Sequence, residues 1–160
     1  MTITKATKDE LGRIEEIYAH AREFMKASGN PDQWGDSYPP SSKIKADISQ
    51  GNLYTVRDGN SILAVFYFRI GIDETYNRIE DGSWITDTPY AVIHRVAVAE
   101  QGRGIIRHIF DYCFAIHPNL RIDTHRDNLP MQRSLAKNGF AYCGIIHLEN
   151  GSDRLAYQKI

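Results

Sequence analysis

The stretch Ala91–Phe114 has the residue types and spacing of a phosphate-binding segment. It begins as a β-rich apolar run, breaks at Gln101–Gly104 and continues as a helical pattern. Backbone N–H groups in the first turn of a helix lack intrahelical partners, and the helix dipole adds positive potential there. Glycine in the turn lets the backbone approach a ligand closely. The segment is therefore predicted to bind the pyrophosphate of a cofactor.

Composition and length limit what kind of protein carries this segment. The chain has 160 residues, of which 42% are hydrophobic and 24% charged. We expect one domain spanning residues 1–160, large enough to bury its own core. Lys and Arg number 19 against 20 Asp and Glu, for a formal charge of −1. This balance gives no general electrostatic attraction to nucleic acid or to a membrane surface.

The lack of a recognisable targeting signal and the small number of cysteines lead us to expect a cytoplasmic protein. The apolar runs are too short to span a membrane, and the first residues lack the apolar core of a signal peptide. The only cysteines, Cys113 and Cys143, each fall in an apolar pattern. We expect them to be buried, reduced thiols.

The elements that must position the segment follow from periodicity and turn residues. A capping box at Thr7–Glu10 precedes a helix that runs to about Ser28. Ser41 or Ser42 is expected to cap a second helix. The remaining elements are strands at 2–6, 53–57, 62–70, 92–98, 120–124, 141–148 and 154–159, helices at 105–114 and 128–138, and an irregular segment at 71–89. This order predicts a mixed α/β sheet rather than a regularly alternating one.

A second segment makes the glycine turn specific. The run Asn128–Phe140 contains an Asn at its start and ends in Lys-x-Gly-Phe. Together with Val96–Val98 and Gln101–Gly104 it resembles the GCN5-related N-acetyltransferase (GNAT) family, and the element order fits over the full length. The family signature is Arg or Gln, two residues, Gly, one residue, then Gly or Ala. The matching residues are Gln101, Gly104, Asn128, Lys137, Gly139 and Phe140.

The resemblance implies an acyl-CoA N-acyltransferase fold, with a central, twisted and mostly antiparallel sheet flanked by helices. It implies acetyl-CoA as the donor, no metal, and direct attack by a small-molecule or amino-terminal amine in a ternary complex. Val96, Ala97 and Val98 would hold the pantetheine arm and the thioester carbonyl. The pyrophosphate would lie on Gln101, Gly102, Arg103, Gly104, Ile105 and Ile106. Asn128 would contact the pantetheine, unless it is only a helix cap.

The sequence departs from the family pattern in three places. Ile106 stands where the signature ends in a small residue, and it could crowd the phosphates. The connection between Val98 and Gln101 is about two residues shorter than usual in the family. Many members carry a Tyr that protonates the leaving thiolate, and Leu135 stands at that position. The pattern therefore supports cofactor binding more firmly than a particular proton path.

Amide formation from a thioester needs a neutral amine, a stabilised oxyanion and a leaving thiolate. His94 is a candidate base because imidazole titrates near neutrality; otherwise it is an ordinary sheet residue. Asp123 lies five positions before Asn128, where ribosomal-protein alanine acetyltransferases of this family have an acidic base; otherwise it is a solvated carboxylate. Ser134 is a weak candidate acid, or else a hydroxyl on the helix surface.

Four large aromatic side chains fall in predicted loops. They either close over the core or form an acceptor pocket whose ring faces suit a cationic amine. These residues are Trp34, Tyr38, Tyr76 and Trp84.

Three function classes remain open on the sequence alone. The first is an N-acetyltransferase acting on a small-molecule or peptide amine. The second is a non-catalytic acyl-CoA-binding or regulatory module, for which Leu135 and Ile106 would be the signs of lost turnover. The third is a nucleotide-binding protein that uses the glycine turn for another diphosphate. Sheet edges in such folds commonly pair, so a homodimer is an open expectation.

Overall fold

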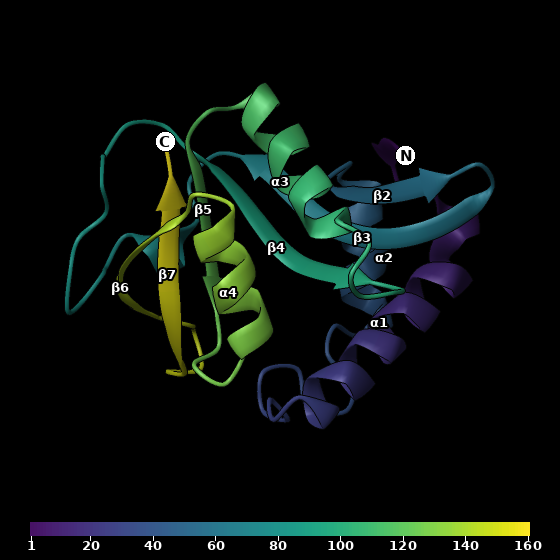
Figure 1. The fold of residues 1–160 in the computed structure, drawn as a ribbon, viewed down its shortest axis with the longest axis horizontal. Coiled ribbons are helices and arrows are strands. Elements are labelled where there is room, and N and C mark those ends of the chain that lie inside the picture. Colours follow the sequence, from purple (N-terminus) through teal and green to yellow (C-terminus); the bar gives the residue numbers. More distant parts are fainter.

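A computed structural model describes residues 1–160, and its elements follow the predicted order (Figure 1). The strands are β1 (Thr2–Lys5), β2 (Leu53–Asp58), β3 (Ser61–Ile70), β4 (Ala91–Val98), β5 (Leu120–Thr124), β6 (Ala141–His147) and β7 (Asp153–Lys159). The helices are α1 (Leu11–Ala27), α2 (Ser41–Ser49), α3 (Ile105–Ile116) and α4 (Leu129–Lys137), with short 3-10 turns η1 (Lys8–Glu10) and η2 (Glu74–Tyr76).

All seven strands form one sheet in the order β1-β2-β3-β4-β5-β7-β6. Every neighbouring pair is antiparallel except β4 and β5, which run parallel. The predicted mixed and mostly antiparallel sheet is therefore confirmed. β1 and β6 are its two edges.

The parallel pair β4–β5 separates soon after it begins. The strands pair only at Ala91–Leu120 and Val92–Arg121. Further along, β4 remains paired with β3 and β5 remains paired with β7. From Ile93 to Val98, β4 consequently has no strand neighbour on its β5 side.

Two helical layers cover the sheet and divide its core in two. Side chains of α1 and α2 pack with Val92 and Ala97 of β4 on one face, here called the α1 face. Side chains of α3 and α4 pack with Ile93 and Val98 on the other, the α3 face. Neighbouring residues of β4 thus serve opposite layers. Val92 and Ala97, five positions apart, share a face because the pairing with β3 shifts register between His94 and Ala97. Figure 1 shows α3 and α4 in front of the sheet and α2 behind it.

Two of the three predicted N-terminal capping interactions are present in the structure. The Thr7 N–H donates to Glu10 Oε1 at 2.8 Å, as the capping box predicts, although this turn is a 3-10 turn that leads into α1. Asn128 Oδ1 accepts from the Met131 N–H at 3.1 Å and caps α4. The predicted serine cap of α2 is wrong, because the helix begins at Ser41 itself and the Ser41 hydroxyl donates to Glu15 on α1 instead.

The long segment 71–89 is irregular, as predicted, but it is fixed firmly on the sheet. Glu80 and Ile145 of β6 exchange two backbone hydrogen bonds of 2.8 Å. The Ile85 N–H donates to Gln158 Oε1 of β7, also at 2.8 Å. Trp84 Nε1 donates to the Tyr76 carbonyl at 2.8 Å and so ties the segment to itself. These bonds determine where the polar residues of the segment lie.

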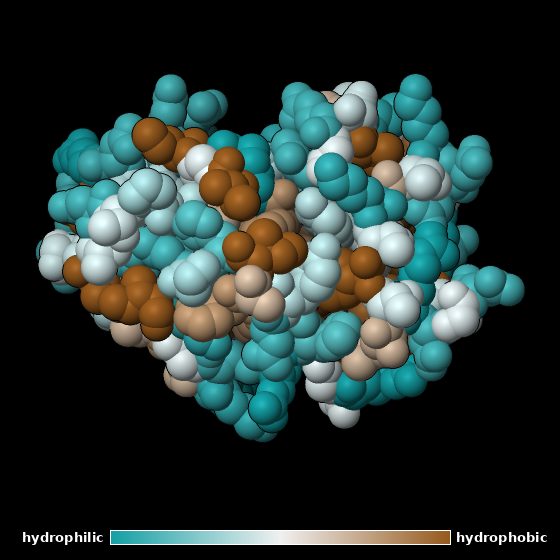
Figure 2. Space-filling model, turned by 90° about the horizontal axis from the view of Figure 1, so that it is seen from above, coloured by the Kyte–Doolittle hydropathy of each residue, from teal (hydrophilic) through white to brown (hydrophobic).

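The outer surface carries scattered apolar side chains. The largest exposed ones include Ile70, Ile72, Ile85 and Ile116. Figure 2 shows the face seen from above, where hydrophilic atoms separate the hydrophobic side chains into small patches. Single exposed apolar residues are ordinary in folded proteins. None of the helices combines the length and apolarity needed to cross a membrane.

Replacing Gly82 should loosen the segment 71–89. A Cβ at Gly82 would lie 1.9 Å from the Cys143 carbonyl oxygen, so Gly82→Ala must displace the segment from β6. We expect a lower melting temperature in calorimetry. Gly12→Ala is the matched control, because a Cβ there meets no atom within 4 Å and alanine favours the helical backbone of α1. Equal melting temperatures for the two variants would contradict the packing described.

Candidate active site

A cleft of about 870 Å³ opens where β4 and β5 separate. Val96 of β4 and the residues 122–124 of β5 border it from the sheet. The connection between α1 and α2 contributes Gln33, Trp34 and Tyr38, and the β6–β7 turn contributes 148–150. The cleft is therefore built from segments that are distant in sequence and meet at the gap in the sheet.

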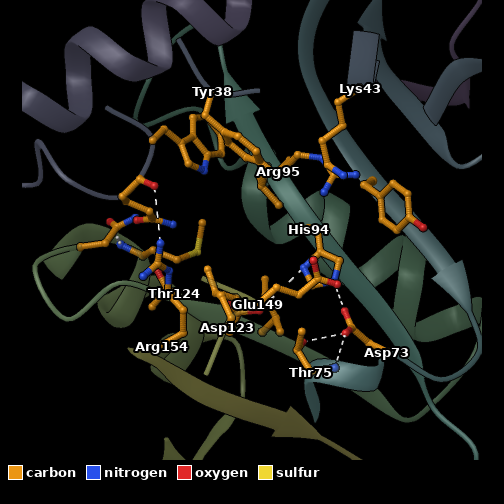
Figure 3. A pocket seen from close by; sticks show the side chains of 18 of the residues that line it. Tyr38, Lys43, Asp73, Thr75, His94, Arg95, Asp123, Thr124, Glu149 and Arg154 are labelled. Carbon is orange, nitrogen blue, oxygen red and sulfur yellow. Dashed lines mark hydrogen bonds and ion pairs between the residues drawn. The ribbon is translucent and has the colours of Figure 1, made fainter. Parts of the chain in front are cut away.

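His94 lies between two carboxylates in this cleft (Figure 3). Its Nε2 is 2.7 Å from Asp73 Oδ2, and its Nδ1 is 3.8 Å from Asp123 Oδ2. The ring contacts those of Tyr67 and Tyr76, which places it on the α1 face of the sheet. The predicted candidates His94 and Asp123 are thus brought together across the separated strands.

Asp73 holds the imidazole in one orientation. Its Oδ1 accepts hydrogen bonds from the Thr75 N–H at 3.0 Å and the Thr75 hydroxyl at 2.7 Å. Burial opposes the negative charge, but the hydrogen bonds from His94 and Thr75 outweigh burial and lower the pKa of Asp73. A carboxylate only accepts hydrogen bonds, so His94 Nε2 must carry the proton. In the neutral ring, Nδ1 then has a free lone pair on the side of Asp123.

Asp123 is held by a buried phenol. The Tyr76 hydroxyl donates to Asp123 Oδ2 at 2.6 Å. Complete burial raises the pKa of Tyr76, and the negative charge of Asp123 raises it further. Tyr76 therefore stays protonated and acts as a fixed donor. Its ring is 1% exposed and lies behind the cleft rather than on its wall.

A bulge in β4 directs the neighbouring arginine. Tyr67 of β3 faces His94 and Val65 faces Ala97, so two residues of β4 lie opposite one residue of β3. Arg95 in this bulge has φ of 51°, which is uncommon for a residue with a side chain. Its guanidinium lies 4.5 Å from the Tyr67 ring centroid and pairs with Asp47 of α2 at 2.7 Å. The bulge thus adds a fixed ion pair to the cleft wall.

A second cavity, of about 650 Å³, surrounds the glycine turn. Gly102 and Gly104 have φ of 79° and 70°, which only glycine adopts readily. The first bond within α3 runs from the His108 N–H to the Gly104 carbonyl at 3.1 Å. The N–H groups of 105–107 therefore have no acceptor within the helix. Cationic side chains border this cavity, namely Arg103, Arg107, Lys137 and Lys159.

β4 connects the two cavities. Val96 borders the first and Val98 the second. The predicted turn residues from Gln101 to Ile106 all border the second cavity, where Ile106 also packs partly against the core. Asn128 borders the first cavity, and its amide donates to Gln33 Oε1 at 2.9 Å in addition to its role as a cap.

The remaining predicted residues lie apart from His94. Ser134 borders the cavity of the glycine turn. Leu135 is fully buried in the α3-face core, so its position faces neither cavity. Trp34 and Tyr38 border the first cleft. Trp84 instead packs against Tyr76 and stacks on the Arg121 guanidinium at 4.1 Å.

Sequence reasoning missed Asp73 and Arg154, both of which border the cleft. A weak signal for Asp73 existed, because an Asp two residues before a Thr favours a local side-chain-capped turn. That pattern predicts a turn but not a histidine partner. Arg154 had no local signal, since it is the second residue of β7, and only pairing with β5 and β6 sets which face of the sheet its side chain occupies.

No protein-family model and no curated protein sequence matches the chain. Among solved structures, an acetyltransferase of the GNAT family from Streptococcus agalactiae is 32% identical with a TM-score of 0.90. The alignment covers 99% of this chain and 94% of that one.

The chain belongs to the GNAT family. A GNAT-family acetyltransferase from Listeria monocytogenes has the same fold, at 18% identity and a TM-score of 0.72, over 99% of this chain and 93% of that one. An acetyltransferase from Salmonella typhimurium, whose structure contains its cofactor acetyl-CoA, aligns at 17% identity and a TM-score of 0.64, over 98% and 91%. The recognition of a GNAT fold from the sequence is therefore confirmed, and the protein is placed among the acetyltransferases.

The Asp73 carboxylate should stabilise the GNAT domain in a pH-dependent way. Because folding lowers its pKa, its contribution is complete above the unfolded-state pKa of about 3.9 and declines as the pH falls from there through the lower pKa of the folded state. We expect Asp73→Asn to lower the free energy of unfolding at pH 6 by about 1–2 kcal/mol, with a smaller difference at pH 3. Urea titrations at both pH values measure this. Asp87→Asn, at an exposed site in the same segment, is the control; a pH-independent difference for Asp73→Asn would contradict the assignment.

Proposed function

We propose that this protein is an acetyl-CoA-dependent N-acetyltransferase whose acceptor is a primary amine on a small molecule or at an amino terminus. The single observation that carries the proposal is that the gap between β4 and β5 leads from the glycine turn to His94 and Asp123. One extended donor can then occupy both cavities, with the amine entering from the α1 face. We propose a cytoplasmic location as well, on the composition of the chain.

The residues of the second cavity fit the pyrophosphate of CoA. Unpaired N–H groups at the start of α3 and the cations Arg103, Lys137 and Lys159 suit a diphosphate. A Cβ at Gly102 or Gly104 would meet nothing within 4 Å, so the turn leaves open space beside its backbone. The unpaired edge of β4 from Ile93 to Val98 supplies backbone groups for the pantetheine arm. Asn128 is a further candidate for contact with that arm.

The first cleft supplies the groups that an amine needs for attack. A bound ammonium would lie between His94 Nδ1 and the Asp123 carboxylate. Asp73 keeps Nδ1 free to accept a proton, and Asp123 stabilises the resulting imidazolium. Acetyl-CoA supplies the acetyl group, whose bond to the amine nitrogen forms as the thioester C–S bond breaks. The sulfur leaves as thiolate and takes up the second proton, which the nitrogen loses as the amide forms. N–H groups on the β4 edge are positioned to stabilise the carbonyl oxygen.

One observation favours a second candidate, a non-catalytic acyl-CoA-binding module. Leu135 is buried where many family members carry the tyrosine that protonates the thiolate, and Ser134 borders the other cavity. Under this alternative the protein would bind acetyl-CoA and CoA without releasing thiol in the presence of amines.

Turnover separates the two candidates. We expect calorimetry to detect binding of acetyl-CoA and CoA, with ATP bound far more weakly. We also expect thiol release from acetyl-CoA in the presence of a panel of primary amines, because Asp73, His94 and Asp123 form a base site beside the donor. Binding without thiol release for every amine would favour the non-catalytic module. Binding of ATP in preference to CoA would overturn both.

His94 should control the pH dependence of turnover. We expect His94→Ala to lower kcat/KM by about 10²- to 10⁴-fold, the usual contribution of a general base, and to remove its limb from the pH–rate profile. Asp123→Ala is expected to show a smaller loss, because Asp123 stabilises the protonated ring. His20→Ala, at an exposed site on α1, is the control. Unchanged profiles for His94→Ala and Asp123→Ala would remove both residues from the mechanism.

A further inference from the structure

Arg154 is a buried cation without an ion-pair partner in the acceptor side of the cleft. The residue is 8% exposed, and its guanidinium donates to the Asp153 carbonyl at 2.9 Å and the Gln33 carbonyl at 3.5 Å. No carboxylate lies within ion-pair distance of it, in contrast to Arg95, which pairs with Asp47. A buried charge that lacks a counter-ion is costly, so a bound anion would stabilise this arrangement.

The other charges of the cleft do not neutralise Arg154. Asp73 is bonded to His94, and Asp47 to Arg95. The rim carboxylates of Asp32 and Glu149 are exposed, so water screens them. The remaining partly buried charged groups of the cleft are Asp123, Lys43, Arg69 and Arg154 itself. Because His94 is neutral, Asp73 keeps its negative charge, and two partly buried carboxylates, Asp73 and Asp123, lie among three cations. One cation is left over, and an anionic group on the acceptor would balance it.

Sheet register places Arg154 next to the proposed amine site. Asp123 of β5 lies opposite Ala156 of β7, and Arg154 is two residues before Ala156 on the same face. Such diagonal neighbours are about 7–8 Å apart at the backbone, within reach of long side chains. Burial lowers the pKa of Arg154, while the negative charge of Asp123 raises it, so the two charges interact. Figure 3 shows both side chains at the same pocket.

The anion for Arg154 is not expected to come from the donor. Arg154 lies on the α1 face and contacts Gln33 in the α1–α2 connection. The free N–H groups and cations suited to phosphates surround the glycine turn, and Arg154 is not among the residues that border that cavity. An anion at Arg154 therefore belongs to the acceptor.

Resting on the proposed N-acetyltransferase function, we propose that the acceptor carries a carboxylate beside its amino group, as a free α-amino acid does. Arg154 binds the carboxylate through its remaining N–H donors, and Asp123 with His94 receives the ammonium. Because Arg154 and Asp123 are diagonal neighbours on adjacent strands and border the same cleft, one compact zwitterion can reach both. Trp34 and Tyr38, on the opposite wall, contact the side chain of the amino acid. Arg154 is thus a specificity-determining residue and takes no part in proton transfer.

Acceptors that differ only in their carboxylate measure the contribution of that group to the reaction. The test measures kcat/KM by thiol release for the standard amino acids, their amides and their decarboxylated amines, with phosphoethanolamine and spermidine added. We expect the best amino acid to exceed its own amide and amine by about tenfold or more, as a charge-assisted pair implies. Arg154→Gln should abolish that advantage while leaving the rate with the amide within about threefold. Arg133→Gln, at an exposed site on α4, should change neither.

Several results would overturn the proposal. One is a preference for amides, spermidine or phosphoethanolamine over every amino acid. Another is an equal loss for acid and amide in Arg154→Gln when the protein still melts cooperatively and binds acetyl-CoA normally. If Arg154→Gln does not fold, Arg154→Lys replaces it. Lysine keeps the positive charge but lacks the two parallel N–H donors of the guanidinium, so we expect it to lose part of the preference for the amino acid over its amide.

Binding distinguishes this proposal from the proposed function. If no amine releases thiol, N-acetyltransferase activity fails, but amino acids and their amides can still be titrated into the CoA-saturated protein. Tighter binding of an amino acid than of its amide, lost in Arg154→Gln, would support the carboxylate site independently of turnover. Equal affinities would overturn it.

Discussion

The site depends on one feature of the sheet, the loss of pairing between β4 and β5 after Val92. Each strand remains paired on its other side, so the gap is held open by the sheet and not by a flexible loop. Opening it exposes a row of backbone groups on β4 and connects the two faces of the molecule at one place. The residues proposed to act on the acceptor lie on the α1 face, and the glycine turn lies at the far end of β4.

The electrostatic environment of the gap determines which of its side chains carry a proton. Asp73 is kept charged by Thr75 and His94, and Tyr76 is kept protonated by burial beside Asp123. These neighbours fix which groups donate and which accept, and they leave Nδ1 of His94 as the free acceptor. The segment 71–89 provides both Asp73 and Tyr76, so its attachment to β6 and β7 matters to the chemistry as much as the sheet does.

Local features of the fold could be predicted because they depend on nearby residues. The apolar periodicity of α1, the Asn128 cap and the glycines of the 101–104 turn each act within a few positions. The order of the elements along the chain and the family resemblance followed from these features. Which side chains of α4 face the cleft was harder to predict from the sequence. Leu135 is buried in the core, and the neighbouring Ser134 consequently borders the cavity of the glycine turn.

The assembled site could not be predicted because its contacts join distant parts of the chain. His94 and Asp73 are 21 positions apart, and Tyr76 and Asp123 are 47 apart. Their meeting depends on the backbone bridge between Glu80 and Ile145, for which the sequence has no marker. Trp84 illustrates the same limit, since its ring covers Tyr76 and Arg121 rather than the cleft. The sequence likewise does not show that Arg154 lies near Asp123, because their proximity depends on the register between β5 and β7.

The most direct test of this account follows the backbone amides by nuclear magnetic resonance during titration with acetyl-CoA. We predict saturable shifts for the amides of 93–98 on β4 and 102–107 at the start of α3, with little change in β1 and β2. Shifts confined to other elements, with β4 unaffected, would contradict the claim that the gap between β4 and β5 holds the donor.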